Sequence, residues 1–170
     1  ARPRVTETAL IAVPGVDAAV RLLASLRAEL GEIVSAFELL PRLGLDLFRE
    51  AGGQPGEPFD RPHPWQVLVE IEANSRHFAL RAALEEAIGK AIDERLAVDA
   101  VLAESGAQRL SLWRLREGIA VAAVADPSSL KNDQSVPCSA IPAFVEQATA
   151  FVESVLPGAR VVPFGHVGDG

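Results

Sequence analysis

His166 lies near the end of the chain in the sequence PFGHVGDG (residues 163–170), where three glycines occur within six residues. Glycines allow a tight backbone and let a ligand approach closely. A histidine held there can ligate a metal or transfer a proton. A metal site needs three or four donors, and no second donor adjoins His166. The residues alone therefore leave a purely structural histidine as the alternative.

Arg116 belongs to a second group of residues that could do chemistry, the sequence LWRLRE at 112–117. The planar guanidinium group of an arginine can bind a carboxylate through two parallel hydrogen bonds. The same stretch also reads as an ordinary helix, with Leu112 and Leu115 in a core stripe and with solvated arginines. Arg114 is expected to face the solvent, and Arg116 is the candidate for ligand binding.

Lys131 lies in a third segment, the sequence LKNDQSVP at 130–137. This composition is typical of an exposed polar loop, in which Asp133 would cap the backbone or pair with a cation. The alternative is that Lys131 and Arg116 together present two positive charges to an anionic ligand. Because the chain has a formal net charge of −7, this local reversal of sign indicates an anion site.

The three segments together resemble motifs of a known family. WRLRE (113–117), KNDQSVP (131–137) and GHVGDG (165–170) resemble the Trp-x-x-Arg-Glu, Lys-x-Asp-x-Ser-x-Pro and Gly-His-x-Gly-Asp-Gly motifs of FAD-linked 2-hydroxyacid dehydrogenases. These enzymes are flavoproteins of the vanillyl-alcohol-oxidase type and include D-lactate, D-2-hydroxyglutarate and glycolate dehydrogenases. Their last motif continues with Asn-x-His, which this sequence lacks. The resemblance is thus to part of their C-terminal substrate-binding (cap) domain, without the FAD-binding domain.

The resemblance implies a role for each of the three residues. Arg116 and Lys131 would bind the substrate carboxylate, and His166 would be catalytic, binding the substrate hydroxyl and easing its deprotonation. In metal-dependent members the residue matching His166 holds a divalent metal, such as zinc or manganese, together with a second histidine and a later glutamate. FAD, bound mainly by the absent domain, would accept the hydride.

The implied reaction is the two-electron oxidation of a small anionic D-2-hydroxy acid to a 2-oxo acid by an FAD-dependent dehydrogenase. The 170 residues alone are expected to be inactive and free of flavin. Carboxylate anchors are shared by lactate, glycolate, hydroxyglutarate and malate, so they do not select the substrate, and the electron acceptor and general base are not identified. Two alternatives are a non-catalytic ferredoxin-like module for a small anion and a structural lid or oligomerisation domain.

Three further residues receive no chemical role. His63, between two prolines, is expected at the surface or in a structural position. Cys138 has no histidine or basic activator nearby in the sequence and is expected to be a small apolar filler. Glu38 resembles part of a recurrent Phe-Glu pair of the family, and no chemistry is assigned to it.

Hydrophobic periodicity predicts the elements that must position these residues. Strands are expected at 5–13, 33–40, 65–72 and 98–103, followed by a last strand at 159–164 that delivers His166. Helices are expected at 16–30, 41–50, 75–92, 106–125 and 139–155. The last of these helices carries a continuous apolar stripe.

Two strand–helix–strand units suggest an α+β fold: an antiparallel sheet with helices packed on one face, in a duplicated ferredoxin-like arrangement. Residues 51–64, with three glycines and four prolines, are expected to form a linker loop. This loop would separate the first half of the cap domain (1–50) from the second half (65–170), which is truncated at its C-terminus.

Composition excludes several classes of protein. Hydrophobic residues make up 49% of the chain, which supplies a buried core and excludes disorder. The negative charge and the lack of a Lys/Arg-rich run argue against nucleic-acid binding, and no apolar run reaches the ~18 residues of a membrane span. The single Cys138 permits no internal disulfide, which fits a reducing compartment. We expect a cytoplasmic protein, with a homodimer and a peripheral position at the inner membrane as further options.

Overall fold

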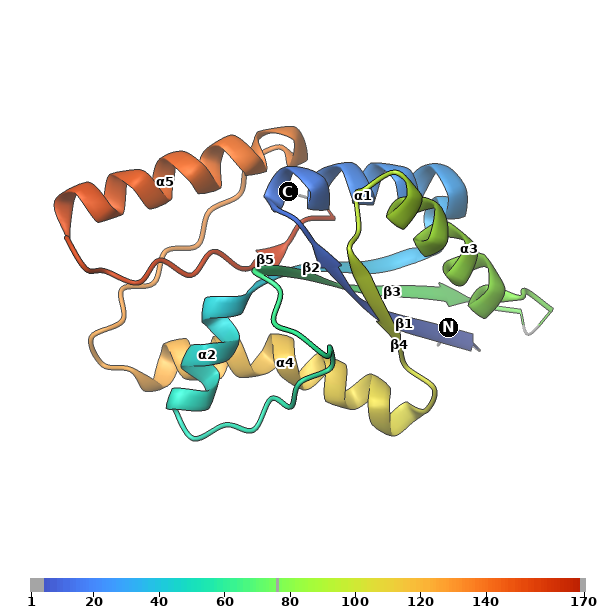
Figure 1. Cartoon of the computed structure of the whole chain (residues 1–170), viewed down its shortest axis with the longest axis horizontal. Coiled ribbons are helices and arrows are strands. Elements are labelled where there is room, and N and C mark those ends of the chain that lie inside the picture. Colours follow the sequence, from blue (N-terminus) through green and yellow to red (C-terminus); the bar gives the residue numbers. More distant parts are fainter. Residues whose placement is uncertain (1–4, 76, 169–170) are drawn as a thin grey trace.

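An antiparallel sheet of five strands runs through the protein in a computed structural model that describes residues 5–75 and 77–168 (Figure 1). The strand order is β4-β1-β3-β2-β5, and every pair of neighbours is antiparallel. The strands are β1 (Val5–Val13), β2 (Val34–Pro41), β3 (Trp65–Ala73), β4 (Asp99–Leu102) and β5 (Gly165–His166). The helices are α1 (Val16–Leu30), α2 (Arg42–Glu50), α3 (Leu80–Asp93), α4 (Gly106–Ala125) and α5 (Ile141–Val155), with 3₁₀ turns η1 (Gly31–Ile33) and η2 (Cys138–Ala140). The predicted α+β class and antiparallel sheet are confirmed.

Strands β1 and β3 form the centre of the sheet and join the two halves of the chain. β1 pairs with β3 from Val5↔Ala73 to Val13↔Trp65, and its other edge pairs with β4. The units β1–α1–β2 and β3–α3–β4 therefore interleave in a single sheet of ferredoxin-like order. Each unit supplies one central and one outer strand, and β5 extends the sheet beyond β2.

The helices cover both faces of the sheet, and the expectation of a single covered face is wrong. Ala9 and Ile11 of β1 belong to the core shared with α1 and α3, whereas Leu10 and Ala12 belong to a second core shared with α2 and α4. Figure 1 shows these two pairs of helices on opposite sides of the strands. Because β1 is apolar on both faces from Ala9 to Val13, one layer of helices would leave Leu10 and Ala12 in water.

Two element boundaries differ clearly from the prediction. The helix expected from residue 75 begins at Leu80, because the hydroxyl of Ser75 accepts a hydrogen bond (3.2 Å) from the N–H of His77 in a preceding turn. The strand expected at 159–164 is unpaired, and only β5 joins the sheet. Pro163 has no N–H to donate to a neighbouring strand, which fits pairing that starts after it.

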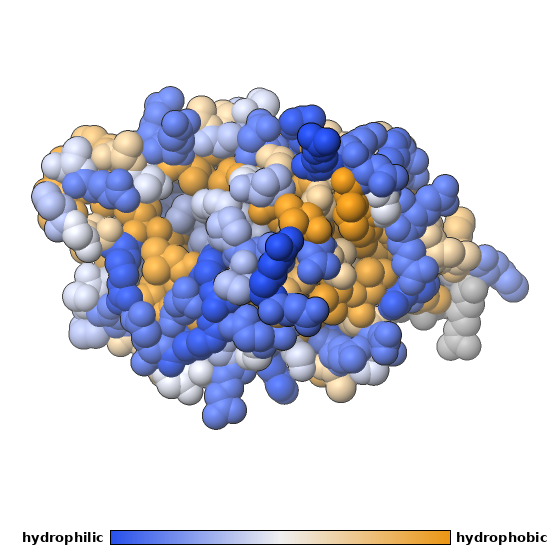
Figure 2. Space-filling view, viewed as in Figure 1, coloured by the Kyte–Doolittle hydropathy of each residue, from blue (hydrophilic) through white to orange (hydrophobic). Residues whose placement is uncertain are grey.

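Helix α5 packs less than its apolar stripe predicts. Ile141 is its buried residue, whereas Phe144, Phe151 and Val155 are exposed by 38%, 66% and 54%. Figure 2 shows hydrophobic surface at the end of the molecule where α5 lies in Figure 1. None of the helices within the described residues is long and apolar enough to cross a membrane.

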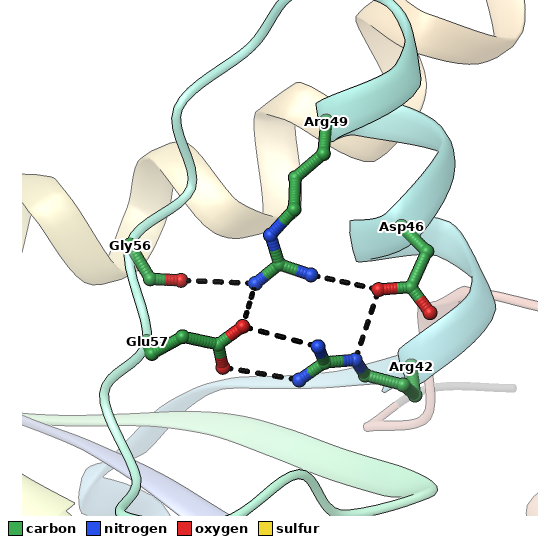
Figure 3. Close-up of polar contacts among 5 residues, drawn as sticks. All are labelled: Arg42, Asp46, Arg49, Gly56 and Glu57. Atoms are coloured by element: carbon green, nitrogen blue, oxygen red, sulfur yellow. Dashed lines mark hydrogen bonds and ion pairs between the residues drawn. The ribbon is translucent and has the colours of Figure 1, made fainter.

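An ion-pair network holds the segment between α2 and β3 against α2 (Figure 3). Glu57 accepts two hydrogen bonds of 3.0 Å from Arg42 and also pairs with Arg49. Asp46 lies 3.0 Å from Arg42 Nε and 2.7 Å from Arg49 Nη1, and Arg49 also donates to the carbonyl oxygen of Gly56 at 3.2 Å. The network thus holds a glycine- and proline-rich segment that has no helix or strand of its own.

Phe59 and His63 anchor the same segment in the core. Both side chains are buried, and their rings meet edge to face with centroids 5.0 Å apart. His63 therefore takes the structural position that was one of the two expected for it.

Gly118 lets α4 lie close to α2. A Cβ at this position would lie 2.2 Å from Cε1 of Phe48, a residue of α2. The Phe48 ring has little room to move away, since a Cβ at Gly53 would lie 2.1 Å from its Cε2 atom on the other side. A glycine in the middle of a helix, where its propensity is low, therefore has a packing role here.

We expect Gly118→Ala to destabilise the protein by about 1–3 kcal/mol, because the added methyl group overpacks the contact with Phe48. The matched control is Gly89→Ala in α3, where nothing lies within 4 Å of the added Cβ. This control should stabilise the protein by about 0.5–1 kcal/mol through the better helix propensity of alanine. Chemical denaturation measures both variants, and effects of the same sign and size would contradict the packing account.

Glu70 is a buried carboxylate that fastens α4 to the sheet. Arg109 donates two hydrogen bonds to it, of 2.7 and 2.9 Å, while Trp113 and Thr8 donate one each, of 2.9 and 2.8 Å. Burial by itself raises the pKa of Glu70, but the hydrogen bonds from Arg109, Trp113 and Thr8 outweigh it and hold the pKa below its ordinary value. Glu70 is therefore ionised in the folded protein at neutral pH.

Because folding lowers the pKa of Glu70, its contribution to stability is fully present above the ordinary glutamate pKa of about 4.3 and is lost as the pH falls below that value. We expect Glu70→Gln to cost about 1–3 kcal/mol at pH 7, since the ion pair with Arg109 is lost. The difference from wild type should shrink toward pH 3. Urea denaturation across this range measures it, with exposed Glu86→Gln as the control. A difference that stays constant with pH would refute the assignment.

Candidate functional site

Strand β5 brings His166 to the edge of the sheet, next to β2. His166 lies opposite Glu38 in the antiparallel pair. The N–H of Val167 donates to the carbonyl oxygen of Phe37 at 3.0 Å, and the Val167 side chain is buried in the core. Gly165 has a φ of 149°, a conformation that favours glycine. Backbone pairing and one core side chain therefore place the histidine.

Side chains from two other elements hold the backbone that follows β5. The thiol of Cys138 donates to the carbonyl oxygen of Val167 at 3.1 Å, and Nη2 of Arg27 donates to the carbonyl oxygen of Gly168. Cys138 packs against the core, as expected of a small filler, and adds this hydrogen bond. Arg27 has no motif that would mark it in the sequence. Residues 169–170, which complete the glycine-rich motif, lie outside the described residues.

Arg116 reaches the same place from α4. Its Nε donates to Oε2 of Glu38 at 2.7 Å, and its guanidinium carbon lies over the ring of Phe164, 5.0 Å from the ring centroid. Within residues 5–75 and 77–168, neither Nη1 nor Nη2 of Arg116 has a hydrogen-bond partner. Two nitrogens of the guanidinium group are therefore unpaired within this part of the chain.

Glu38 joins the two site residues. Its Oε2 accepts the hydrogen bond from Arg116, and its Oε1 lies in close contact with Nδ1 of His166. A buried carboxylate is costly unless polar or charged partners surround it, so a glutamate between Phe37 and Leu39 is a signal in the sequence. Sequence reasoning gives Glu38 no role, because both partners come from elements far along the chain.

The Glu38 cluster is the name used here for Glu38, Arg116, Phe164 and His166. It has a buried end and an exposed end. The side chains of Glu38, Arg116 and His166 are 1%, 20% and 67% exposed. Since Nδ1 of His166 faces Glu38, Nε2 of the ring is available on the outer side. The cluster can therefore bind a carboxylate at the guanidinium group and move a proton at the imidazole.

Lys131 does not join the Glu38 cluster. It is exposed in the segment that connects α4 to η2, and no contact links it to Arg116 or His166 in the part of the chain that the structure describes. Its expected role in binding the substrate carboxylate stays a prediction.

His166 offers one metal donor, Nε2, because Nδ1 faces Glu38. Among residues 5–75 and 77–168 there is no group of three or more His, Cys, Asp or Glu side chains that could hold a metal ion. A metal such as zinc takes at least three protein donors. The described residues do not by themselves make a metal site.

Two hollows in the surface lie away from the Glu38 cluster. One, of about 430 Å³, lies between β1, Arg81 and the start of α4, and the other, of about 540 Å³, lies between η1, the end of β3 and Phe78. Neither is lined by a residue of the cluster, whose outer residue His166 is largely exposed. A substrate held there needs a second surface to exclude water.

Comparisons with known proteins agree with one another. The family described as FAD linked oxidases, C-terminal domain, matches residues 2–170. D-2-hydroxyglutarate dehydrogenase of Xanthomonas citri pv. viticola is 36% identical over 168 residues, which cover 99% of this chain and 34% of that protein. D-2-hydroxyglutarate dehydrogenase of Stutzerimonas stutzeri is 31% identical over 137 residues (81% and 29%), and the mitochondrial enzyme of that name from Arabidopsis thaliana is 31% identical over 150 residues (88% and 26%). The chain spans between a quarter and about a third of the length of these relatives.

Proposed function

Because the chain belongs to the family of FAD-linked oxidase C-terminal domains, as its three motifs predict, we propose that it is the substrate-binding part of a flavin-dependent dehydrogenase. The whole protein would oxidise a D-2-hydroxy acid to the corresponding 2-oxo acid. The observation that carries this proposal is the Glu38 cluster, in which a guanidinium group and a largely exposed imidazole contact the same carboxylate.

Arg116 binds the substrate carboxylate in this proposal. Its Nε is held by Glu38, and the outer edge of the guanidinium group, Nη1 and Nη2, matches the two oxygens of a carboxylate. Phe164 supports the flat face of the group through a cation–π contact. The guanidinium group is therefore already oriented before the substrate binds, which lowers the entropic cost of ordering this side chain.

His166 acts on the hydroxyl group. Oxidation of a 2-hydroxy acid removes the hydroxyl proton and a hydride from the carbon that bears the hydroxyl. With the carboxylate on Arg116, we propose that Nε2 of His166 takes up the hydroxyl proton. FAD, held by the part of the protein outside this chain, supplies the hydride acceptor.

Lys131 is proposed as a further anchor for an anionic substrate. Several relatives are named for D-2-hydroxyglutarate, which carries two carboxylates, and a second cation would suit the distal one. The divalent metal expected at His166 needs donors beyond the described residues, so no step is assigned to it. A homodimer, the cytoplasmic location and a peripheral position at the inner membrane stay predictions.

We expect Arg116→Lys to raise KM for D-2-hydroxyglutarate or D-lactate about 10- to 100-fold in the whole flavoprotein, with a smaller change in kcat. The lysine keeps a positive charge near Glu38 but loses the two-pronged contact, which corresponds to about 1.5–3 kcal/mol for a hydrogen bond to a charged group. Steady-state kinetics with a dye as electron acceptor measure both constants.

The matched control for this variant is Arg114→Lys, since Arg114 lies on the exposed side of the same helix. It should leave both constants within about twofold. Unchanged constants in both Arg116→Lys and Lys131→Ala would contradict the proposal and favour a structural lid. Binding of small anions without any turnover by the whole protein would favour a non-catalytic module.

A further inference from the structure

We propose that Glu38 is the positioning residue of this site, setting the proton position and direction of the His166 ring and the direction of the Arg116 fork at the same time. The inference rests on the proposed function for its catalytic meaning. The geometry that motivates it involves only residues of this chain. One buried carboxylate contacts both Arg116 and His166, each through a different oxygen.

Oε1 is the atom of Glu38 that faces His166. This atom is buried and has no aligned hydrogen-bond donor among the described residues, while Nδ1 of His166 lies within ion-pair distance of it. A buried acceptor without a donor is costly. The His166 side chain is largely exposed, and a turn of its ring would align an Nδ1–H with this oxygen and remove that cost. The carboxylate therefore favours the ring form with Nδ1 protonated, which leaves Nε2 as the free acceptor.

Oε2 is the atom of Glu38 that holds Arg116. This oxygen accepts from Nε, the inner nitrogen of the guanidinium group, at 2.7 Å. Because the group is planar, holding Nε and stacking the face on Phe164 directs the edge formed by Nη1 and Nη2 outward. Glu38 thereby sets the relative orientation of the carboxylate anchor and the proton acceptor.

Glu70 shows what a purely structural carboxylate looks like on the same face of the sheet. It also pairs with an arginine of α4, but its partners Arg109, Trp113 and Thr8 leave neither oxygen without a donor. Glu38, by contrast, turns one oxygen toward a largely exposed histidine. Glu70→Gln is therefore the matched control for Glu38→Gln.

The first test is nuclear magnetic resonance of the 170-residue chain, which needs neither flavin nor substrate. At a pH where an ordinary histidine is neutral, the ¹⁵N shifts of His166 should show a protonated Nδ1 in the wild type. In Glu38→Gln the amide oxygen must accept from Arg116 Nε, so the amide nitrogen faces His166 and the proton should move to Nε2.

The control Glu70→Gln should leave the proton of His166 on Nδ1. A wild-type ring with a bare Nδ1, or a ring form that is the same in Glu38→Gln as in wild type, would overturn the proposal. The wild-type spectrum decides the first point even if the variant does not fold.

The second test uses the whole flavoprotein. Glu38→Gln should lower kcat about 10- to 100-fold, as is typical when the group that orients a site histidine is removed, and should also raise KM through Arg116. Glu70→Gln should lower stability and leave both constants near wild type. Kinetic constants unchanged in Glu38→Gln would overturn the positioning role, whereas a wild-type protein that oxidises no D-2-hydroxy acid would overturn the proposed function and leave the spectroscopic result standing.

Discussion

Carboxylates buried between the sheet and α4 decide how that helix lies, because each must meet a charged donor to be tolerated there. Glu70 of β3 meets Arg109, and Glu38 of β2 meets Arg116. The two arginines are seven residues apart, close to two turns of an α-helix, so they point from the same face. Both ion pairs fasten α4 to the sheet, and the pair with Glu38 alone holds the Arg116 side chain, so this arginine is oriented without help from a flexible loop.

The candidate site depends on how β5 pairs with β2 at the edge of the sheet. Only two residues of β5 pair with β2, but they place His166 opposite Glu38. Arg27 and Cys138 then hold the backbone carbonyls of the next two residues. One end of the Glu38 cluster is thus buried and held by the fold, and the other end, at His166, is open to solvent.

Local structure could be predicted from the sequence to a large extent, because hydrophobic periodicity and turn residues act over short distances. The bounds of β1, α1 and α4 agree with the prediction. That helices cover both faces of the sheet could not be predicted as readily. The alternating side chains of β1 form two apolar sets, one on each face, instead of one apolar and one polar set. The apolar stripe of α5 predicts a partner surface, but not where that surface lies.

The site was predictable only in part, because contacts between distant elements cannot be predicted from local patterns. Arg116 and His166 are marked by motifs, and the structure brings them to one carboxylate. No comparable motif marks that carboxylate, Glu38. Its role depends on a strand register and a helix rotation that arise only on folding. The expectation that Arg116 and Lys131 act together also depends on how the chain folds. No contact among the described residues joins the two.

The most direct test of the account is a crystal structure of the whole flavoprotein with a D-2-hydroxy acid bound. The account predicts the substrate carboxylate on Nη1 and Nη2 of Arg116 and the hydroxyl next to Nε2 of His166, with Glu38 still bound to Nε and Nδ1. A substrate bound away from the Glu38 cluster, or an Arg116 released from Glu38 to reach it, would contradict the account.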